Sequence, residues 1–118
     1  VMDEPTSQLD PAGTRMVYDV LGALSAAGTT IVIVEHKTEL LHEHCDQVAV
    51  LADGRIVLSA DPTTVFADDR LSGWGVGPTR ITLAGRAARE RGLTDAARPL
   101  PVSVDDAVAY FTTGEGRR

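Results

Sequence analysis

The first third of the chain combines short unbroken apolar runs with one stretch of helical spacing. Asp10-Pro11 is typical of a helix start, with Asp as the N-cap and Pro in the first turn. Residues 29–34 (TTIVIV) form a continuous β-branched run, typical of a buried parallel strand. With the apolar pair Val1-Met2, expected to end a strand that begins upstream, this order predicts a strand–helix–strand unit. The helix is expected to turn one apolar face toward the protein core, formed by Met16, Val17, Val20, Leu21 and Leu24.

The middle of the chain predicts a short helix, a hairpin and a second short helix. Residues 37–45 carry a pair of leucines at helical positions, and residues 47–51 (QVAVL) and 55–59 (RIVLS) are strand-like. An Asp53-Gly54 turn between those two runs predicts an antiparallel hairpin. Asp61-Pro62 repeats the helix-start signal and predicts a helix that continues through Phe66.

The composition changes near residue 70. Residues 71–78 (LSGWGVGP) hold three Gly and one Pro, which predicts a loop or linker. An amphipathic helix is expected over 79–91, with Ile81, Ala84 and Ala88 on one side. Ser103 and Asp106 resemble a capping box at the start of a last helix, after which residues 114–118 are expected to fray. The chain as a whole reads as an α/β protein.

Charge and composition narrow the function classes. The 118 residues carry a net charge of −6, with −9 on residues 1–69 and +3 on residues 70–118. An acidic chain is poorly suited to nonspecific nucleic-acid binding, which needs clustered Lys and Arg. No apolar run approaches the ~20 residues of a membrane span. The single Cys45 allows no internal disulfide, which is compatible with a cytoplasmic protein.

Candidate chemistry lies where the two predicted strands end. Asp3-Glu4 follows the first strand and His36 follows the second, and ligands of open α/β sheets bind at this carboxyl edge. One carboxylate can hold Mg²⁺ while its neighbour orients or deprotonates a water. Taken alone, the Asp-Glu pair is more simply explained as solvated acids in a loop. The chain holds one lysine, Lys37, and no Gly-rich loop precedes it, so this sequence contains no complete phosphate-binding P-loop.

The order of motifs changes that balance. Asp3-Glu4-Pro5-Thr6-Ser7-Gln8-Leu9-Asp10 resembles the Walker B end and D-loop of the ATP-binding-cassette (ABC) ATPases, and His36 lies where that family has its switch histidine. The hairpin with its Asp-Gly turn and the segment Asp61-Pro62-Thr63-Thr64-Val65-Phe66 follow in the family's order. The family's P-loop, glutamine loop and LSGGQ signature all precede Walker B. Leu71-Ser72-Gly73-Trp74-Gly75 lies on the wrong side of the histidine to be that signature.

The resemblance implies roles for five residues. Asp3 would bind Mg²⁺, through water, and Glu4 would be the general base or water-orienting acid. His36 would contact the γ-phosphate and the attacking water. Ser7 and Asp10 would belong to the nucleotide site, with Asp10 reaching the partner's phosphate site across a dimer. ATP and Mg²⁺ are the implied cofactors, and phosphoryl transfer depends on this kind of positioning and charge neutralisation.

The resemblance also implies an organisation. Residues 1–68 would be the C-terminal part of a P-loop NTPase domain of the ABC type, and residues 69–118 a small, mostly helical extension. The tail, with Gly77-Pro78, Leu83-Ala84 and Leu100-Pro101, resembles that of the energy-coupling-factor (ECF) importer ATPases. The implied partners are a second ATPase subunit in a head-to-tail dimer and transmembrane transporter subunits, with no nucleic acid. The implied location is the inner face of the cell membrane, and the fragment alone is expected to be inactive.

Three alternatives remain open. The chain could be a non-catalytic dimerisation or regulatory module in which the ATPase part is a passenger. It could also belong to an ABC system outside the ECF class, with the same chemistry and other partners. Finally, His42 and Cys45, three residues apart, could share a helix face and bind Zn²⁺.

Overall fold

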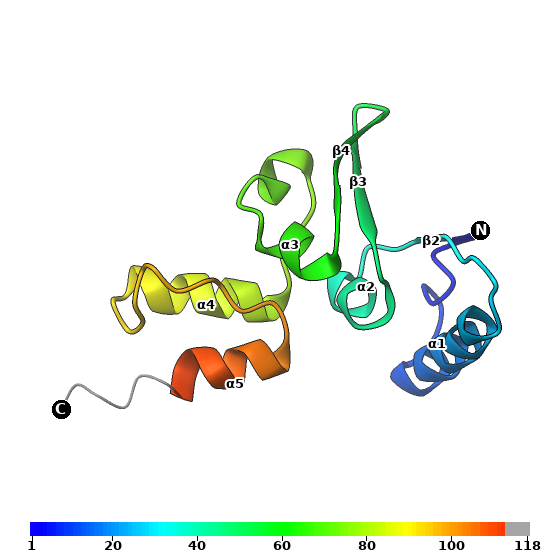
Figure 1. Cartoon of the computed structure of the whole chain (residues 1–118), viewed down its shortest axis with the longest axis horizontal. Coiled ribbons are helices and arrows are strands. Elements are labelled where there is room, and N and C mark those ends of the chain that lie inside the picture. The colour runs from blue at the N-terminus through cyan, green and yellow to red at the C-terminus, as the bar shows by residue number, and fades with distance from the viewer. Residues whose placement is uncertain (113–118) are drawn as a thin grey trace. The chain divides into compact units, whose positions relative to one another are not determined.

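The computed structural model describes residues 1–112, coloured by position in Figure 1. The expected fraying of residues 114–118 therefore lies outside the described part of the chain. Two compact units divide after Lys37, and each is described by itself. None of the helices in the described part has the length and apolar character that a membrane crossing requires.

The first unit is a strand–helix–strand, as the hydrophobic pattern predicts. It contains β1 (Met2–Asp3), α1 (Pro11–Ala26) and β2 (Ile33–Val34), and the two strands pair in parallel with Asp3 opposite Val34. The expected strand over 29–34 is shorter in the structure. The reason is that β1 contributes only two residues to the described pairing.

The packing face of α1 differs from the expected one. Asp10 caps the helix as predicted, since its carboxylate accepts from the Gly13 amide at 2.7 Å. The exposed side chains include three expected core residues: Met16 at 69%, Val20 at 60% and Leu24 at 45%. The buried stripe is Thr14, Tyr18 and Leu21. Leu21 is thus buried as predicted, while the buried face is rotated from the expected one toward Thr14 and Tyr18.

The second unit begins with α2 (Thr38–His44), the hairpin β3 (Val48–Ala52) and β4 (Arg55–Ala60), and α3 (Pro62–Ala67). Both turn residues have left-handed backbones, with φ of 49° at Asp53 and 74° at Gly54, as a two-residue hairpin requires. Asp61 caps α3 through the Thr64 amide at 3.0 Å. The helix, hairpin and second helix are thus confirmed.

The core of the second unit joins the hairpin to segments beyond residue 70. Its buried residues are Val48, Val50, Val65, Phe66, Leu71 and Val102. The expected loop over 71–78 begins with a 3₁₀ turn (Leu71–Trp74), and Leu71 is fully buried. The division near residue 69 therefore does not coincide with a gap in packing. Whether it separates a catalytic part from an extension stays a prediction.

The remaining helices are α4 (Arg80–Glu90) and α5 (Val104–Thr112), which pack against each other (Figure 1). The predicted capping box is confirmed, because the Ser103 amide donates to Asp106 at 2.9 Å and the Asp106 amide donates back to the Ser103 hydroxyl at 3.1 Å. On α4 the buried residues are Thr82, Gly85 and Ala88, and Ala84 is exposed. Of the residues expected on one side of this helix, Ala88 is buried and Ala84 is not, because the helix turns its smallest residue, Gly85, toward Pro101.

Candidate functional site

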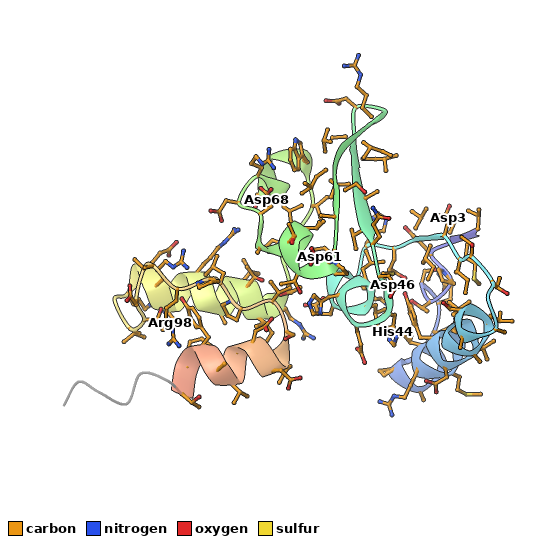
Figure 2. The ribbon with its side chains drawn as sticks, in the orientation of Figure 1. Asp3, His44, Asp46, Asp61, Asp68 and Arg98 are labelled. Atoms are coloured by element: carbon orange, nitrogen blue, oxygen red, sulfur yellow. The ribbon has the colours of Figure 1, made fainter. Side chains whose placement is uncertain are left out.

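The parallel pairing of β1 and β2 brings the predicted site residues to one edge. The Met2 amide donates to the Val32 carbonyl and the Glu4 amide to the Val34 carbonyl, both at 2.8 Å. The two strands therefore end side by side, with Asp3-Glu4 after one and Glu35-His36 after the other. Asp3 lies exposed at the end of β1 (Figure 2), where its carboxylate is open to solvent.

Glu4 and His36 contact each other directly. The His36 Nε2 atom lies 2.5 Å from Glu4 Oε1. An ionised carboxylate only accepts, so the imidazole nitrogen is the donor. The His36 side chain is 81% exposed and that of Glu4 39% exposed, so this edge is accessible to a ligand.

The backbone of Glu4 is strained. Its φ of 45° lies in the left-handed region, which costs a non-glycine residue about 1–2 kcal/mol. The conformation opens a turn in which the Ser7 amide donates to the Glu4 carbonyl at 3.2 Å. Strain of this kind concentrates at functional sites, where the surrounding structure maintains it.

Glu35 links the two loops that carry Glu4 and His36. Its Oε2 atom accepts from the Thr6 hydroxyl at 3.1 Å. Its Oε1 atom accepts from the backbone amides of His36 at 2.9 Å and Lys37 at 3.2 Å. Thr6 is completely buried and Glu35 is partly buried. One carboxylate thereby fixes both the turn after β1 and the chain direction after β2.

The other two predicted site residues lie outside this cluster of contacts. Ser7 is exposed, and Asp10 is exposed while it caps α1. The predicted role of Asp10 involves a partner subunit, and the geometry of this chain tests neither that role nor the assignment of Ser7 to the nucleotide site. The donor set at the edge does fit Mg²⁺, a hard ion that proteins hold through one or two carboxylates together with water and substrate phosphates.

The alternative zinc site finds no support in residues 1–112. Within that range no three His, Cys, Asp or Glu side chains converge on a point. His42 Nε2 lies 3.1 Å from the Thr63 hydroxyl. Burial and the nearby Asp46 charge raise the pKa of the Cys45 thiol, which disfavours the thiolate that a metal would need.

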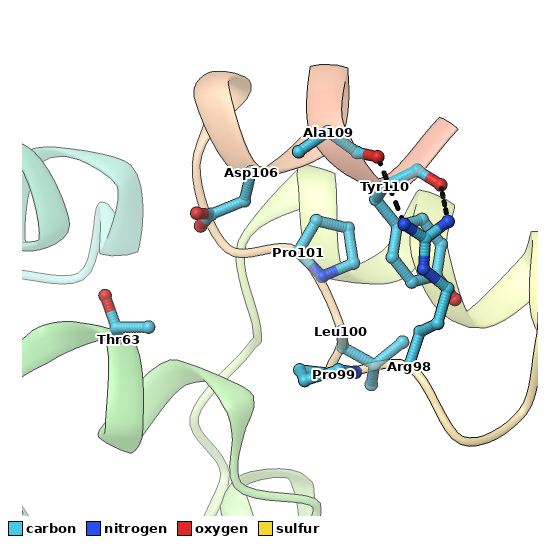
Figure 3. Close-up of a pocket in the computed structure, with 8 residues that line it drawn as sticks. All are labelled: Thr63, Arg98, Pro99, Leu100, Pro101, Asp106, Ala109 and Tyr110. Carbon is cyan, nitrogen blue, oxygen red and sulfur yellow. Dashed lines mark hydrogen bonds between the residues drawn. The ribbon is translucent and has the colours of Figure 1, made fainter. Parts of the chain in front are cut away.

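A cavity of about 260 Å³ lies between α3, α5 and the segment before α5 (Figure 3). Arg98 donates from this cavity to the carbonyls of Tyr110 at 2.9 Å and Ala109 at 3.4 Å, which satisfies the C-terminal end of α5. Asp106 accepts from the amides of Val102 and Ser103. The charged groups of the cavity are thus engaged in holding α5, which makes it a structural junction.

Comparison with known proteins identifies proteins that are similar to this chain in sequence. No protein-family model matches it. A putative ABC transporter ATP-binding protein of Pyrococcus horikoshii is 43% identical over 100 residues, which cover 82% of this chain and 35% of that protein. The homologues of the present chain are thus ABC transporter ATP-binding proteins.

The ABC homologues include proteins of the ECF class. The energy-coupling factor transporter ATP-binding protein EcfA2 of Symbiobacterium thermophilum is 37% identical over 111 residues, which cover 92% of this chain and 38% of that protein. The EcfA2 of Streptococcus sanguinis is 35% identical over 103 residues, covering 86% and 37%. The chain spans 35%, 38% and 37% of the length of these three relatives, which is little more than a third. The recognition of an ABC ATPase with ECF-like features is thereby confirmed.

The sequence singles out Glu4 and His36, whose roles stay predictions, and it does not indicate that Glu35 and Thr6 connect their loops. The sequence motifs give no role to Glu35, and they contain Thr6 only as part of the segment from Asp3 to Asp10. An available signal was the position of Glu35, an acid placed directly after a β-branched run. Because side chains alternate along a strand, an acid there can turn toward the interior while the next residue points outward.

Proposed function

We propose that this chain is part of the ATP-hydrolysing subunit of an ABC importer of the ECF class. The observation that carries the proposal is the contact between Glu4 and His36 at the shared end of two parallel strands. The names of the relatives support it, since they describe ATP-binding proteins of ABC and ECF transporters. In this proposal residues 1–68 belong to a P-loop NTPase domain, and residues 69–118 are its extension.

The proposed mechanism assigns each acid a separate task. Glu4 orients the attacking water and accepts its proton. The His36 ring, which donates to Glu4, would contact the γ-phosphate of a bound ATP. Asp3 would hold Mg²⁺, which when bound neutralises charge on the phosphate oxygens. Ser7 and Asp10, both exposed, would belong to the nucleotide site, with Asp10 reaching the phosphate site of a second ATPase subunit. Transmembrane transporter subunits would complete the assembly at the cytoplasmic face of the membrane.

The substitution Glu4→Gln in a full-length protein carrying this segment tests the mechanism. Gln keeps the size of the side chain and removes the proton acceptor, so steady-state ATP hydrolysis should fall by at least ~100-fold, within the range that general-base catalysis contributes. Equilibrium ATP binding should stay within about threefold of the parent. Turnover that survives the substitution would remove Glu4 from the reaction.

One observation favours a second candidate, a dimerisation or regulatory module. Three apolar side chains follow one face of α5 and are exposed: Val104 at 67%, Val108 at 58% and Phe111 at 45%. An exposed apolar stripe of this kind is typical of an interaction surface. Sedimentation velocity of the chain and of its Val108→Lys variant tests the module. A dimer of the parent chain that dissociates in the variant supports it, and a parent chain that is monomeric contradicts it.

A further inference from the structure

We infer that Glu35 is a positioning residue, which holds the Glu4 loop and the His36 loop in the geometry that hydrolysis needs. The inference rests on the proposed function and adds to it a residue that neither the motif pattern nor the names of the relatives assign. Its basis is a set of three hydrogen bonds to one carboxylate, from the Thr6 hydroxyl and from the His36 and Lys37 amides.

The contacts of His36 explain why such a residue is needed. The imidazole is 81% exposed and touches Glu4, so little protein surrounds the ring to restrain it. Its direction depends on the backbone from which it projects. That backbone is fixed on both sides of the His36 Cα, because Glu35 Oε1 accepts from the amides of His36 and Lys37.

The second oxygen of Glu35 controls the other loop. Thr6 is completely buried, so a hydroxyl without a partner there would carry the full cost of desolvation. Its bond to Glu35 Oε2 anchors the turn that begins at the strained Glu4. The loops that carry both reacting side chains are thus held by one carboxylate. A displacement of about 1 Å in either side chain can lower the rate about 100-fold.

The test uses a full-length protein carrying this segment, with steady-state ATPase assays that separate kcat from KM. Glu35→Ala should lower kcat by at least ~10-fold and change KM by less than about threefold. Glu35→Gln should restore kcat to within about threefold of the parent, because its oxygen can accept the two amides and its NH₂ can donate to the Thr6 hydroxyl. Thr6→Val should lower kcat, while Thr6→Ser, which keeps the hydroxyl, should not.

The double variant Glu35→Ala with Thr6→Val tests whether the two residues act through the same hydrogen bond. Its kcat should equal that of Glu35→Ala alone, since both substitutions break the same link. Any of three results would overturn the inference. They are a double variant whose loss of kcat is the product of the two single losses, an unchanged kcat in Glu35→Ala, and a Glu35→Gln variant as slow as Glu35→Ala. If Glu35→Ala does not fold by circular dichroism, the Thr6→Val and Thr6→Ser pair decides, and equal kcat values for the two overturn it.

The Glu4→Gln variant, assayed alongside, separates this inference from the proposed function. A loss of turnover in Glu4→Gln together with normal kcat in the Glu35 and Thr6 variants means that the ATPase proposal stands and the positioning role fails. Normal turnover in Glu4→Gln means that the proposed function fails, and the positioning role fails with it.

Discussion

Glu4 shows at the scale of one residue how function and stability conflict. Its left-handed backbone, with φ of 45°, is the conformation that glycine adopts without cost. The side chain nevertheless has to be a carboxylate if it is to receive a proton from water. The fold therefore accepts local strain at the position where the proposed reaction needs an acid, and the turn to Ser7 and the Thr6–Glu35 bond maintain it.

Replacing Glu4 by glycine and by alanine measures that strain. Glu4→Gly should give a higher free energy of unfolding than Glu4→Ala by about 1 kcal/mol, because only alanine keeps a Cβ in the left-handed region. Urea denaturation followed by circular dichroism provides the comparison. The matched control is Asp3, which lies in a strand, where alanine should instead be more stable than glycine. The same order at both positions would contradict the strain.

Asp68 offers a second prediction at this scale, through its pairing with Arg70. Side-chain and backbone hydrogen bonds from Arg70 lower the pKa of the Asp68 carboxyl to about 2 (the side chain is labelled in Figure 2). Because the folded pKa lies below the ordinary value of 3.8, the pair stabilises the fold above about pH 4. That contribution is lost as the pH falls through about 2.

A carbon-detected NMR titration of the Asp68 carboxyl checks this directly. Arg70→Gln should move its pKa upward toward 3.8. Arg86→Gln is the matched control, since Arg86 pairs with the neighbouring Asp69 at 2.7 Å and should leave the Asp68 titration near 2. An Asp68 carboxyl that titrates at 3.8 in the parent chain would refute the pairing.

At the scale of elements, the starts of helices and the hairpin turn could be predicted from the sequence, whereas the buried faces of the helices could be predicted only in part. Asp10, Asp61 and the Ser103–Asp106 pair cap helices as expected, because capping needs only groups within three residues of each other. The face that a helix buries depends on partners far along the chain. The periodicity of α1 therefore predicted Leu21 correctly but also indicated Met16 and Val20, which are exposed, and it did not indicate Tyr18, which is buried.

Gly85 on α4 gives a prediction of the same kind. A Cβ at this position would lie 2.6 Å from Cδ and 2.9 Å from Cγ of Pro101, and the ring of a proline cannot move aside easily. Gly85→Ala should therefore destabilise the second unit by ~1–3 kcal/mol despite the better helix propensity of alanine. Unfolding in urea can be followed by the fluorescence of Trp74, the single tryptophan.

Gly77→Ala is the control for this substitution. Its Cβ would meet no atom within 4 Å and its backbone is not left-handed, so stability should change by less than ~1 kcal/mol. Equal stabilities for the two variants would mean that α4 and the Pro101 segment do not approach as closely as described.

At the scale of the whole molecule, the family and the positions of Glu4 and His36 at the ends of two strands could be predicted, while the division after Lys37 could not. The motif order needs only sequence spacing, and parallel strands bring their carboxyl ends together in any α/β sheet. The boundary expected from composition near residue 70 stays a prediction, and Leu71 and Val102, which follow it, belong to the same core as the hairpin. Composition reports local flexibility, whereas core membership is decided by contacts that are distant in sequence.

The last prediction concerns ATP binding by the 118-residue chain itself. Phosphate cradles combine backbone amides of a Gly-rich loop with a lysine, and the one lysine of this sequence, Lys37, follows the switch position instead. Asp3 and Glu4 add negative charge beside the expected phosphates, within a segment of residues 1–69 that carries −9. Isothermal titration calorimetry with MgATP should show a Kd weaker than ~1 mM, or less than about 4 kcal/mol of binding free energy. The full-length protein, measured under the same conditions, is the positive control. A micromolar Kd for the chain alone would mean that its own residues form a phosphate site, and the dependence on a separate P-loop would have to be abandoned.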